Sequence, residues 1–197
     1  MRLLRLLPTL AAAGLLLSAC GALTPGAAAT VDDETISMTE LDDTARVYCD
    51  INALTAQQQG IQAIDNAAVR RQAVTDLVLE RVATDIAEQR DITIPSPSAP
   101  DPDQLVEVFD DRAPEVADTL AQAQDLYALL AAIGSDASGV PVAEDNRDQL
   151  AEAGRTLAMA SFDDYDVEFS PRLGLTDAGE TTDQIGSLSV SADAGSA

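Results

Sequence analysis

Hydrophobic residues recur every three or four positions over most of the chain between residues 37 and 161. This spacing places them on one face of an α-helix, whereas the alternation typical of a half-buried strand is confined to short stretches near the two ends. The pattern predicts helices over residues 37–60, 66–90, 105–109, 114–133 and 144–161, with a loop at 134–139. The sequence therefore predicts a mainly α fold with several helices.

Residue types at the ends of these segments support the boundaries. Ser37 with Glu40, and Thr39 with Asp42, both have the hydroxyl-to-acid spacing of a capping box. Two apolar lines run along residues 66–90, so we expect the middle of this helix to be buried on more than one side. The prolines within residues 91–102 cannot continue a helix, and they predict an extended connector.

Two short β-compatible segments lie at the ends of the helical region. Val31 precedes an acidic turn at residues 32–34, and Val167 and Phe169 alternate with Glu168. We expect the two ends of the domain to meet in a small two-stranded β element that closes a domain over residues 29–174. Residues 175–197 consist mostly of small and polar residues, a composition typical of a disordered tail.

The first twenty residues have the organisation of a secretory signal. Arg2 and Arg5 precede an apolar run over residues 6–17, which is short for a permanent transmembrane helix. The run ends in Leu-Ser-Ala-Cys followed by Gly21, which resembles a bacterial lipobox. The resemblance implies a signal peptide at 1–19, diacylation of Cys20 by chains such as palmitate, and a lipidated tether at 20–28. Two acyl chains hold a protein stably, so we expect a lipoprotein on the extracytoplasmic face of the cell membrane.

The composition excludes several kinds of chemistry. The chain has 34 acidic and 11 basic residues and a net charge of −23, which rules out nucleic-acid binding. It has neither Lys nor His, so Schiff bases, His-dependent triads and imidazole metal ligands are excluded. Acidic clusters such as residues 163–168 lack the spacing of a helix-loop-helix calcium site and are typical of solvated surface. Six aromatic residues are few for a glycoside hydrolase, so we expect neither an enzyme nor a cofactor.

Cys49 has no partner within the chain if Cys20 carries lipid, so an intramolecular disulfide is not expected. It follows Tyr48 on an apolar helix face, and the chain contains no Lys or His that would activate a thiol. We interpret Cys49 as a small buried hydrophobe, with a reactive thiol or an intermolecular bridge as the alternatives.

The strictest helical pattern in the chain lies within residues 114–133, where a wide apolar stripe needs a partner surface. Such a stripe belongs to a core more often than to a groove. If it is a groove, the candidate peptide-binding residues are Leu126, Tyr127, Leu130 and Ile133.

Residues 30–37, 71–83, 92–94 and 165–174 resemble, in this order, the N-terminal domain of SurA-type and PrsA-type extracytoplasmic chaperones. In that family a strand, an acidic or Asn turn and a capped helix precede a long helix, an extended exit and a segment that returns to the first strand. The resemblance covers most of residues 30–174 and implies a helical domain, open to one side, that holds unfolded polypeptide. We expect no parvulin isomerase domain of the kind that many family members carry, because few residues follow residue 174.

Two functions follow as hypotheses. The first is a membrane-anchored lipoprotein that binds unfolded secreted or envelope polypeptides as a holdase. The second is a non-catalytic envelope adaptor that docks one folded partner. A holdase binds many unfolded clients weakly, whereas an adaptor ignores them and selects one partner.

Overall fold

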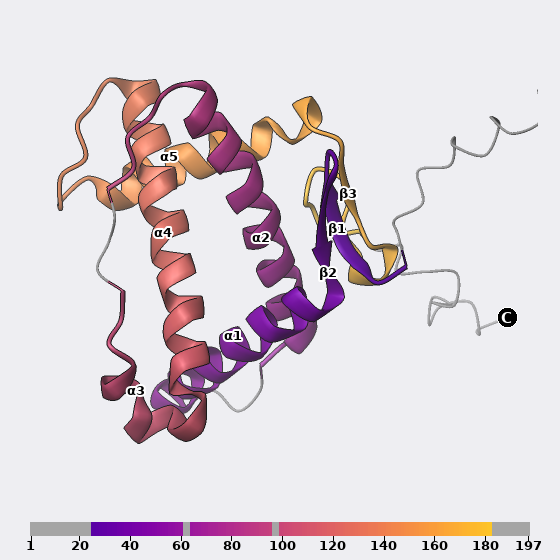
Figure 1. The fold of residues 1–197 in the computed structure, drawn as a ribbon, viewed down its shortest axis with the longest axis vertical. Helices are drawn as coiled ribbons and strands as arrows, with labels where there is room; N and C mark the ends of the chain where they lie inside the picture. The colour runs from indigo at the N-terminus through magenta and orange to yellow at the C-terminus, as the bar shows by residue number, and fades with distance from the viewer. Residues whose placement is uncertain (1–24, 61–63, 96–98, 183–197) are drawn as a thin grey trace, which may run out of the picture.

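A computed structural model describes residues 25–60, 64–95 and 99–182, so the expected signal peptide and Cys20 lie outside the described residues. The fold is mainly helical, as the spacing predicts. Its helices are α1 (Met38–Gln59), α2 (Asn66–Gln89), α3 (Pro102–Phe109), α4 (Ala113–Ser138) and α5 (Arg147–Ala160). Figure 1 shows α2 and α4 as two sides of a frame that α1 closes at one end and α5 at the other.

Side chains at the helix ends explain where the helices begin. The Ser37 side chain accepts a hydrogen bond from the backbone N–H of Glu40 at 3.0 Å, so Ser37 rather than Thr39 is the N-cap of α1. Asp65 caps α2 by accepting from the backbone N–H groups of Ala67 and Ala68. Asp101 caps α3 in the same way, which starts that helix within the proline-rich segment where an extended connector is predicted.

The β element has three strands instead of the two expected. Strands β1 (Ala27–Val31), β2 (Glu34–Ser37) and β3 (Val167–Phe169) form an antiparallel sheet in the order β2-β1-β3. The register places Thr30 opposite Glu168, so the expected meeting of the two ends is confirmed. The third strand arises because Asp32 adopts a positive φ of 50° and turns the chain back on β1. The Asp32 carboxylate also accepts a hydrogen bond from the backbone N–H of Asp166 at 2.9 Å.

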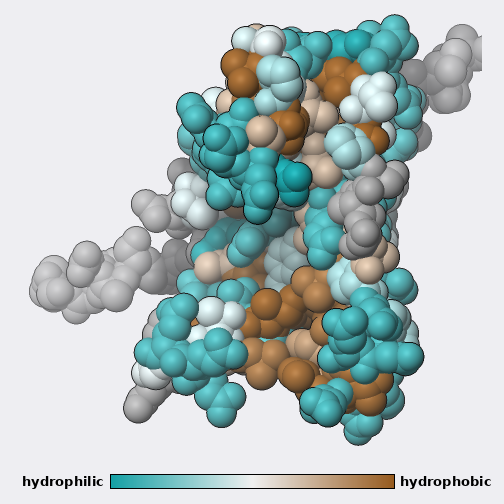
Figure 2. All heavy atoms as spheres, turned by 90° about the vertical axis from the view of Figure 1, so that its left-hand side faces the viewer, coloured by the Kyte–Doolittle hydropathy of each residue, from teal (hydrophilic) through white to brown (hydrophobic). Residues whose placement is uncertain are grey.

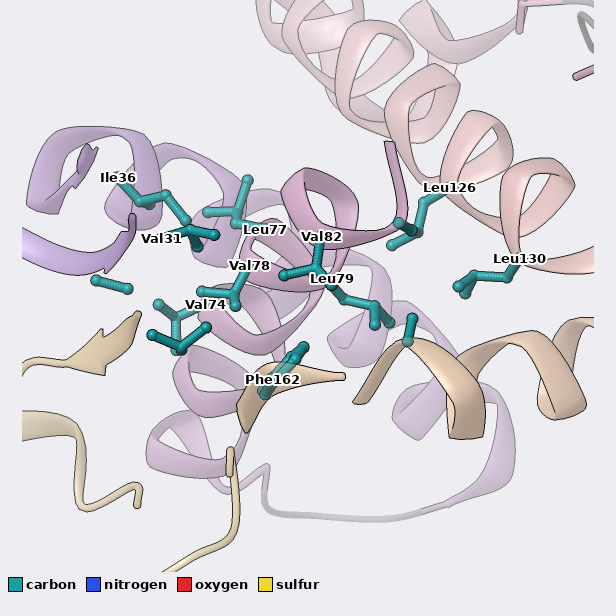
Figure 3. Packing of buried hydrophobic residues seen from close by; sticks show 14 of the residues in the cluster. Val31, Ile36, Val74, Leu77, Val78, Leu79, Val82, Leu126, Leu130 and Phe162 are labelled. Atoms are coloured by element: carbon teal, nitrogen blue, oxygen red, sulfur yellow. The ribbon is translucent and has the colours of Figure 1, made fainter. Parts of the chain in front are cut away.

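Helix α2 is the central element of the hydrophobic core. Figure 3 shows its side chains between Val31 and Ile36 of the sheet on one side and Leu126 and Leu130 of α4 on the other. The expected burial of α2 on more than one side is therefore confirmed. Phe162, in the turn η2 (Phe162–Asp164) after α5, supplies an aromatic ring to a core that otherwise consists mostly of aliphatic side chains.

Helices α4 and α5 cross at two glycines. A Cβ atom added at Gly134 would lie 2.0 Å from the carbonyl oxygen of Leu150, and one added at Gly154 would lie 1.9 Å from that of Leu130. Each glycine thus lets the backbone of the other helix approach closely, an arrangement that any side chain would disrupt.

This crossing corrects the predicted loop at residues 134–139. Helix α4 continues through Gly134 to Ser138 and ends only at Gly139, which has a φ of 68° and donates its backbone N–H to the Ser135 carbonyl. Gly139 is the C-terminal stop, because it adopts the left-handed conformation that glycine favours. Gly134 serves helix packing instead, and local sequence signals do not separate these two uses of glycine.

The C-terminal boundary of the folded domain lies beyond residue 174, where the composition predicts it. Leu175 is buried, although the predicted tail begins there. It forms an isolated antiparallel bridge with Thr181, and the backbone N–H of Thr182 donates to the carbonyl of Gly174 at 2.9 Å. Hydrophobic burial of one leucine and a short turn extend the defined chain to Thr182. The rest of the predicted tail, residues 183–197, lies outside the described residues.

Candidate functional site

A pocket of about 420 Å³ opens inside the helical frame, with walls from α1, α2, α4 and α5. The same helical spacing that builds the core places side chains from each helix at the pocket, because residues three and four apart share a face. Its apolar wall is formed by Ile51, Ala123, Leu126, Leu130 and Ala151.

A polar network also lines the pocket. The Asp76 carboxylate of α2 accepts from the Arg155 guanidinium of α5 at 3.2 Å and from the Tyr48 hydroxyl of α1 at 3.3 Å. The Asp76 side chain is only 11% exposed, whereas that of Arg155 is 35% exposed. The network therefore joins three helices through one mostly buried carboxylate.

Burial sets the direction of the pKa shifts in this network. Desolvation raises the pKa of Asp76, and the neighbouring Arg155 opposes the rise. Desolvation also raises the pKa of Tyr48, and the adjacent Asp76 carboxylate raises it further. Tyr48 therefore stays a neutral hydrogen-bond donor at physiological pH.

The rim of the pocket carries two further carboxylates, both on α5. The Tyr127 hydroxyl of α4 donates a hydrogen bond to Asp148, and this bond raises the pKa of Tyr127. Glu152 lies one turn further along α5 and also lines the pocket. Both acidic residues are exposed, and neither forms an ion pair with any residue that the structure describes.

The structure brings three of the four predicted peptide-binding residues to the pocket. Leu126, Tyr127 and Leu130 line the pocket, although Leu126 and Leu130 are only 6% and 2% exposed and also belong to the core. Ile133 is completely buried and does not line this pocket. The stripe thus serves the core along most of its length and reaches the pocket only at its middle.

Sequence reasoning missed the polar wall. Asp76 interrupts the apolar run at residues 73–79, and a charged residue in such a run is a local signal of a buried partner. Nothing nearby in the sequence identifies that partner, because Arg155 lies 79 positions further along the chain.

A second surface, the α3 surface, is formed by α3 and the end of α1. Val106 and Val108 of α3 are 47% and 57% exposed, and no residue of this helix is buried. Val108 and Phe109 line a shallow pocket of about 320 Å³ together with Leu54 of α1. Figure 2 shows hydrophobic residues gathered on the lower part of this side of the molecule, where Figure 1 places α3.

Cys49 departs from the expectation of a buried hydrophobe. It is a free cysteine and only partly buried on α1, with its Sγ 3.8 Å from Oδ1 of Asn66. Within residues 25–182, the two short gaps apart, no three His, Cys, Asp or Glu side chains converge as a metal site would require. No described helix combines the length and hydropathy needed to cross a bilayer.

The chain matches no protein family model, no curated protein and no solved structure. The resemblance to the SurA-type domain therefore stays a prediction from the sequence.

Proposed function

We propose that this protein is a lipid-anchored, non-catalytic lipoprotein that binds unfolded polypeptide at the extracytoplasmic face of the cell membrane. The observation that carries the proposal is the open pocket between α1, α2, α4 and α5, which has an apolar wall and a polar wall. A concave site of this size takes a few side chains of a client, whereas a folded surface contacts it only at the rim.

The walls of the pocket suit weak and broad binding. Aliphatic side chains such as Ile51 and Leu126 attract apolar groups of any shape, because hydrophobic attraction is non-directional. The high negative charge of the chain keeps the protein soluble and separate from its neighbours while the pocket is empty. These are the properties that a holdase needs.

Membrane anchoring rests on the lipobox-like sequence that ends at Cys20. We expect the mature protein to fractionate with membranes and to carry a diacyl mass on Cys20 in mass spectrometry. A Cys20→Ser variant loses this mass and leaves the membrane fraction. Retention of that variant in membranes would contradict lipid anchoring.

An adaptor that docks one folded partner is the second candidate, and the α3 surface favours it. Exposed Val106 and Val108 on a short amphipathic helix are typical of a docking patch. An adaptor of this kind loses its partner on Val108→Asp and has no effect on unfolded proteins.

The test follows light scattering while a urea-denatured secreted protein aggregates, with the purified full chain at equal molarity. We expect wild type to suppress scattering. Ala123→Trp fills the pocket from a half-buried position and is expected to abolish the suppression, whereas Ala153→Trp, on the exposed face of α5, retains it. Circular dichroism confirms that both variants fold. No suppression by wild type refutes the holdase and favours the adaptor.

A further inference from the structure

We infer that the pocket selects polypeptide segments in which a basic side chain is flanked by apolar residues. This inference rests on the proposed client-binding function and specifies which segments of a client bind. It follows from the charges, the aromatic rings and the apolar wall of one pocket.

The charges that line the pocket have a negative balance. Three carboxylates, those of Asp76, Asp148 and Glu152, face one guanidinium, that of Arg155. Arg155 is paired with Asp76 at 3.2 Å, so it does not neutralise the two acids on α5. Arg147 lines a neighbouring pocket that shares Tyr127 with this one, and it does not line this pocket itself.

Aromatic rings lie beside these carboxylates. Tyr48 and Tyr127 both line the pocket, and the Tyr127 hydroxyl is already hydrogen-bonded to Asp148. The face of an aromatic ring attracts an organic cation, and the attraction grows where water is excluded. The Tyr127 ring beside Asp148, with the Tyr48 ring beside Asp76 in the same pocket, therefore forms a site for an ammonium or guanidinium group.

The apolar wall matches the rest of a basic side chain and its neighbours. Lys and Arg carry long aliphatic stems, which can lie along Ile51, Leu126 and Leu130 while the charged group reaches the rim. Apolar residues next to the basic residue in the client can cover the remaining wall. A client segment of this kind can contact the apolar residues and the carboxylates of the pocket at the same time.

The charge of the whole chain acts in the same direction. A net charge of −23 attracts cationic segments over distances longer than a direct contact and repels acidic ones. The contacts within the pocket then decide whether a basic segment is held. These two contributions can be separated, because only the second depends on acids at the rim.

The experiment compares three short peptides that share the same apolar residues and carry Arg, Gln or Glu at the centre. Each has a neutral fluorophore, and fluorescence anisotropy follows its binding to the purified full chain at low ionic strength. We expect the Arg peptide to bind about tenfold more tightly than the Gln peptide and the Glu peptide to bind most weakly. The preference for Arg should fall as salt screens the charges.

Two matched variants separate the pocket from the overall charge. Asp148→Asn with Glu152→Gln removes two charges at the rim, and the Asn side chain can still accept from the Tyr127 hydroxyl. Asp163→Asn with Asp164→Asn removes two charges from exposed positions in η2, outside the pocket. The first pair should remove most of the preference for Arg, and the second should retain it.

Each other outcome overturns a defined part of this reasoning. Equal binding of the Arg and Gln peptides overturns the inference and leaves the proposed function intact. A preference that both variant pairs reduce equally, or that neither reduces, also overturns it, because the selectivity then lies outside the pocket. Failure of all three peptides to bind, together with a failure to suppress aggregation, overturns the proposed function itself.

Discussion

The crossing of α4 and α5 holds one wall of the pocket in place, so a substitution there should affect both stability and binding. Gly154→Ala is the smallest such change, because it adds a single methyl group. That methyl carbon would lie 1.9 Å from the carbonyl oxygen of Leu130, whereas real contacts of this kind are essentially never shorter than 3.0 Å. The two helices must therefore separate by at least about 1 Å.

The expected cost combines two opposing effects. Overpacking of this kind costs about 1–3 kcal/mol, and backbone atoms on the other side of the clash favour the upper part of that range. The higher helix propensity of alanine relative to glycine stabilises the folded state by up to about 1 kcal/mol and offsets part of this cost. We expect a net loss of about 2 kcal/mol in the free energy of unfolding, or about 4–8 °C in Tm for a chain of this length.

Separation of α5 from α4 also moves Arg155 away from Asp76, so the variant should bind unfolded clients more weakly than wild type. Thermal unfolding followed by circular dichroism measures the first effect, and suppression of aggregation measures the second. Ala153→Ser is the matched control, since it adds one atom to the exposed face of the same helix. We expect the control to unfold within about 1 °C of wild type.

A double variant sharpens the test. Gly134→Ala clashes with the carbonyl oxygen of Leu150 at the same crossing. Because one widening of the crossing relieves both clashes, the double variant should cost less than the sum of the single ones. A Gly154→Ala protein as stable as wild type, or more stable, would refute the close crossing.

Three other predictions concern the polar contacts between elements. Arg155→Met removes the ion-pair partner of the Asp76 carboxylate, whose side chain is 11% exposed, and should cost about 1–3 kcal/mol at pH 7. Burial raises the pKa of Asp76, so the loss should shrink as the pH falls and this carboxylate is protonated, and a loss independent of pH would contradict this. Tyr165→Phe removes a 2.7 Å hydrogen bond to Asp85 and should cost about 1 kcal/mol. Burial raises the pKa of Tyr165 from 10.0 to about 12, so its contribution, complete below pH 10, is lost as pH rises through 12, and the difference between wild type and variant in urea unfolding should vanish there. Ser37→Ala removes the N-cap of α1 and should cost about 1 kcal/mol, whereas Thr39→Ala should cost less.

Local sequence signals predict the helices and the strands at the two ends of the domain, because the formation of these elements depends largely on neighbouring residues. The apolar lines along residues 66–90 and the hydroxyl of Ser37 act within a few positions of the chain, and both indicate the correct element. Gly134 shows the limit of such signals. Its role depends on the Leu150 carbonyl across the α4–α5 interface, and the same residue in isolation indicates a helix end.

In the candidate site too, local sequence signals predict some residues, whereas others are brought together only by the tertiary fold. The apolar wall was within reach of sequence reasoning, since Leu126 and Leu130 belong to the strictest helical stripe. The polar wall was not, because Tyr48, Asp76 and Arg155 come from three helices that only the tertiary fold brings together. Ile133 shares the stripe but is completely buried and does not line the pocket, so the pattern alone predicts a longer groove than the structure has.

The most direct measurement for the central claim is site-specific photo-crosslinking of a permanently unfolded secreted polypeptide to the full chain. A photoreactive residue is placed at position 127, at the pocket, or at position 153, on the exposed face of α5. We expect a crosslink from position 127 that excess unlabelled client competes away, and little or none from position 153. Equal crosslinking from both positions, or none from position 127, would contradict the account that the pocket between the four helices binds unfolded polypeptide.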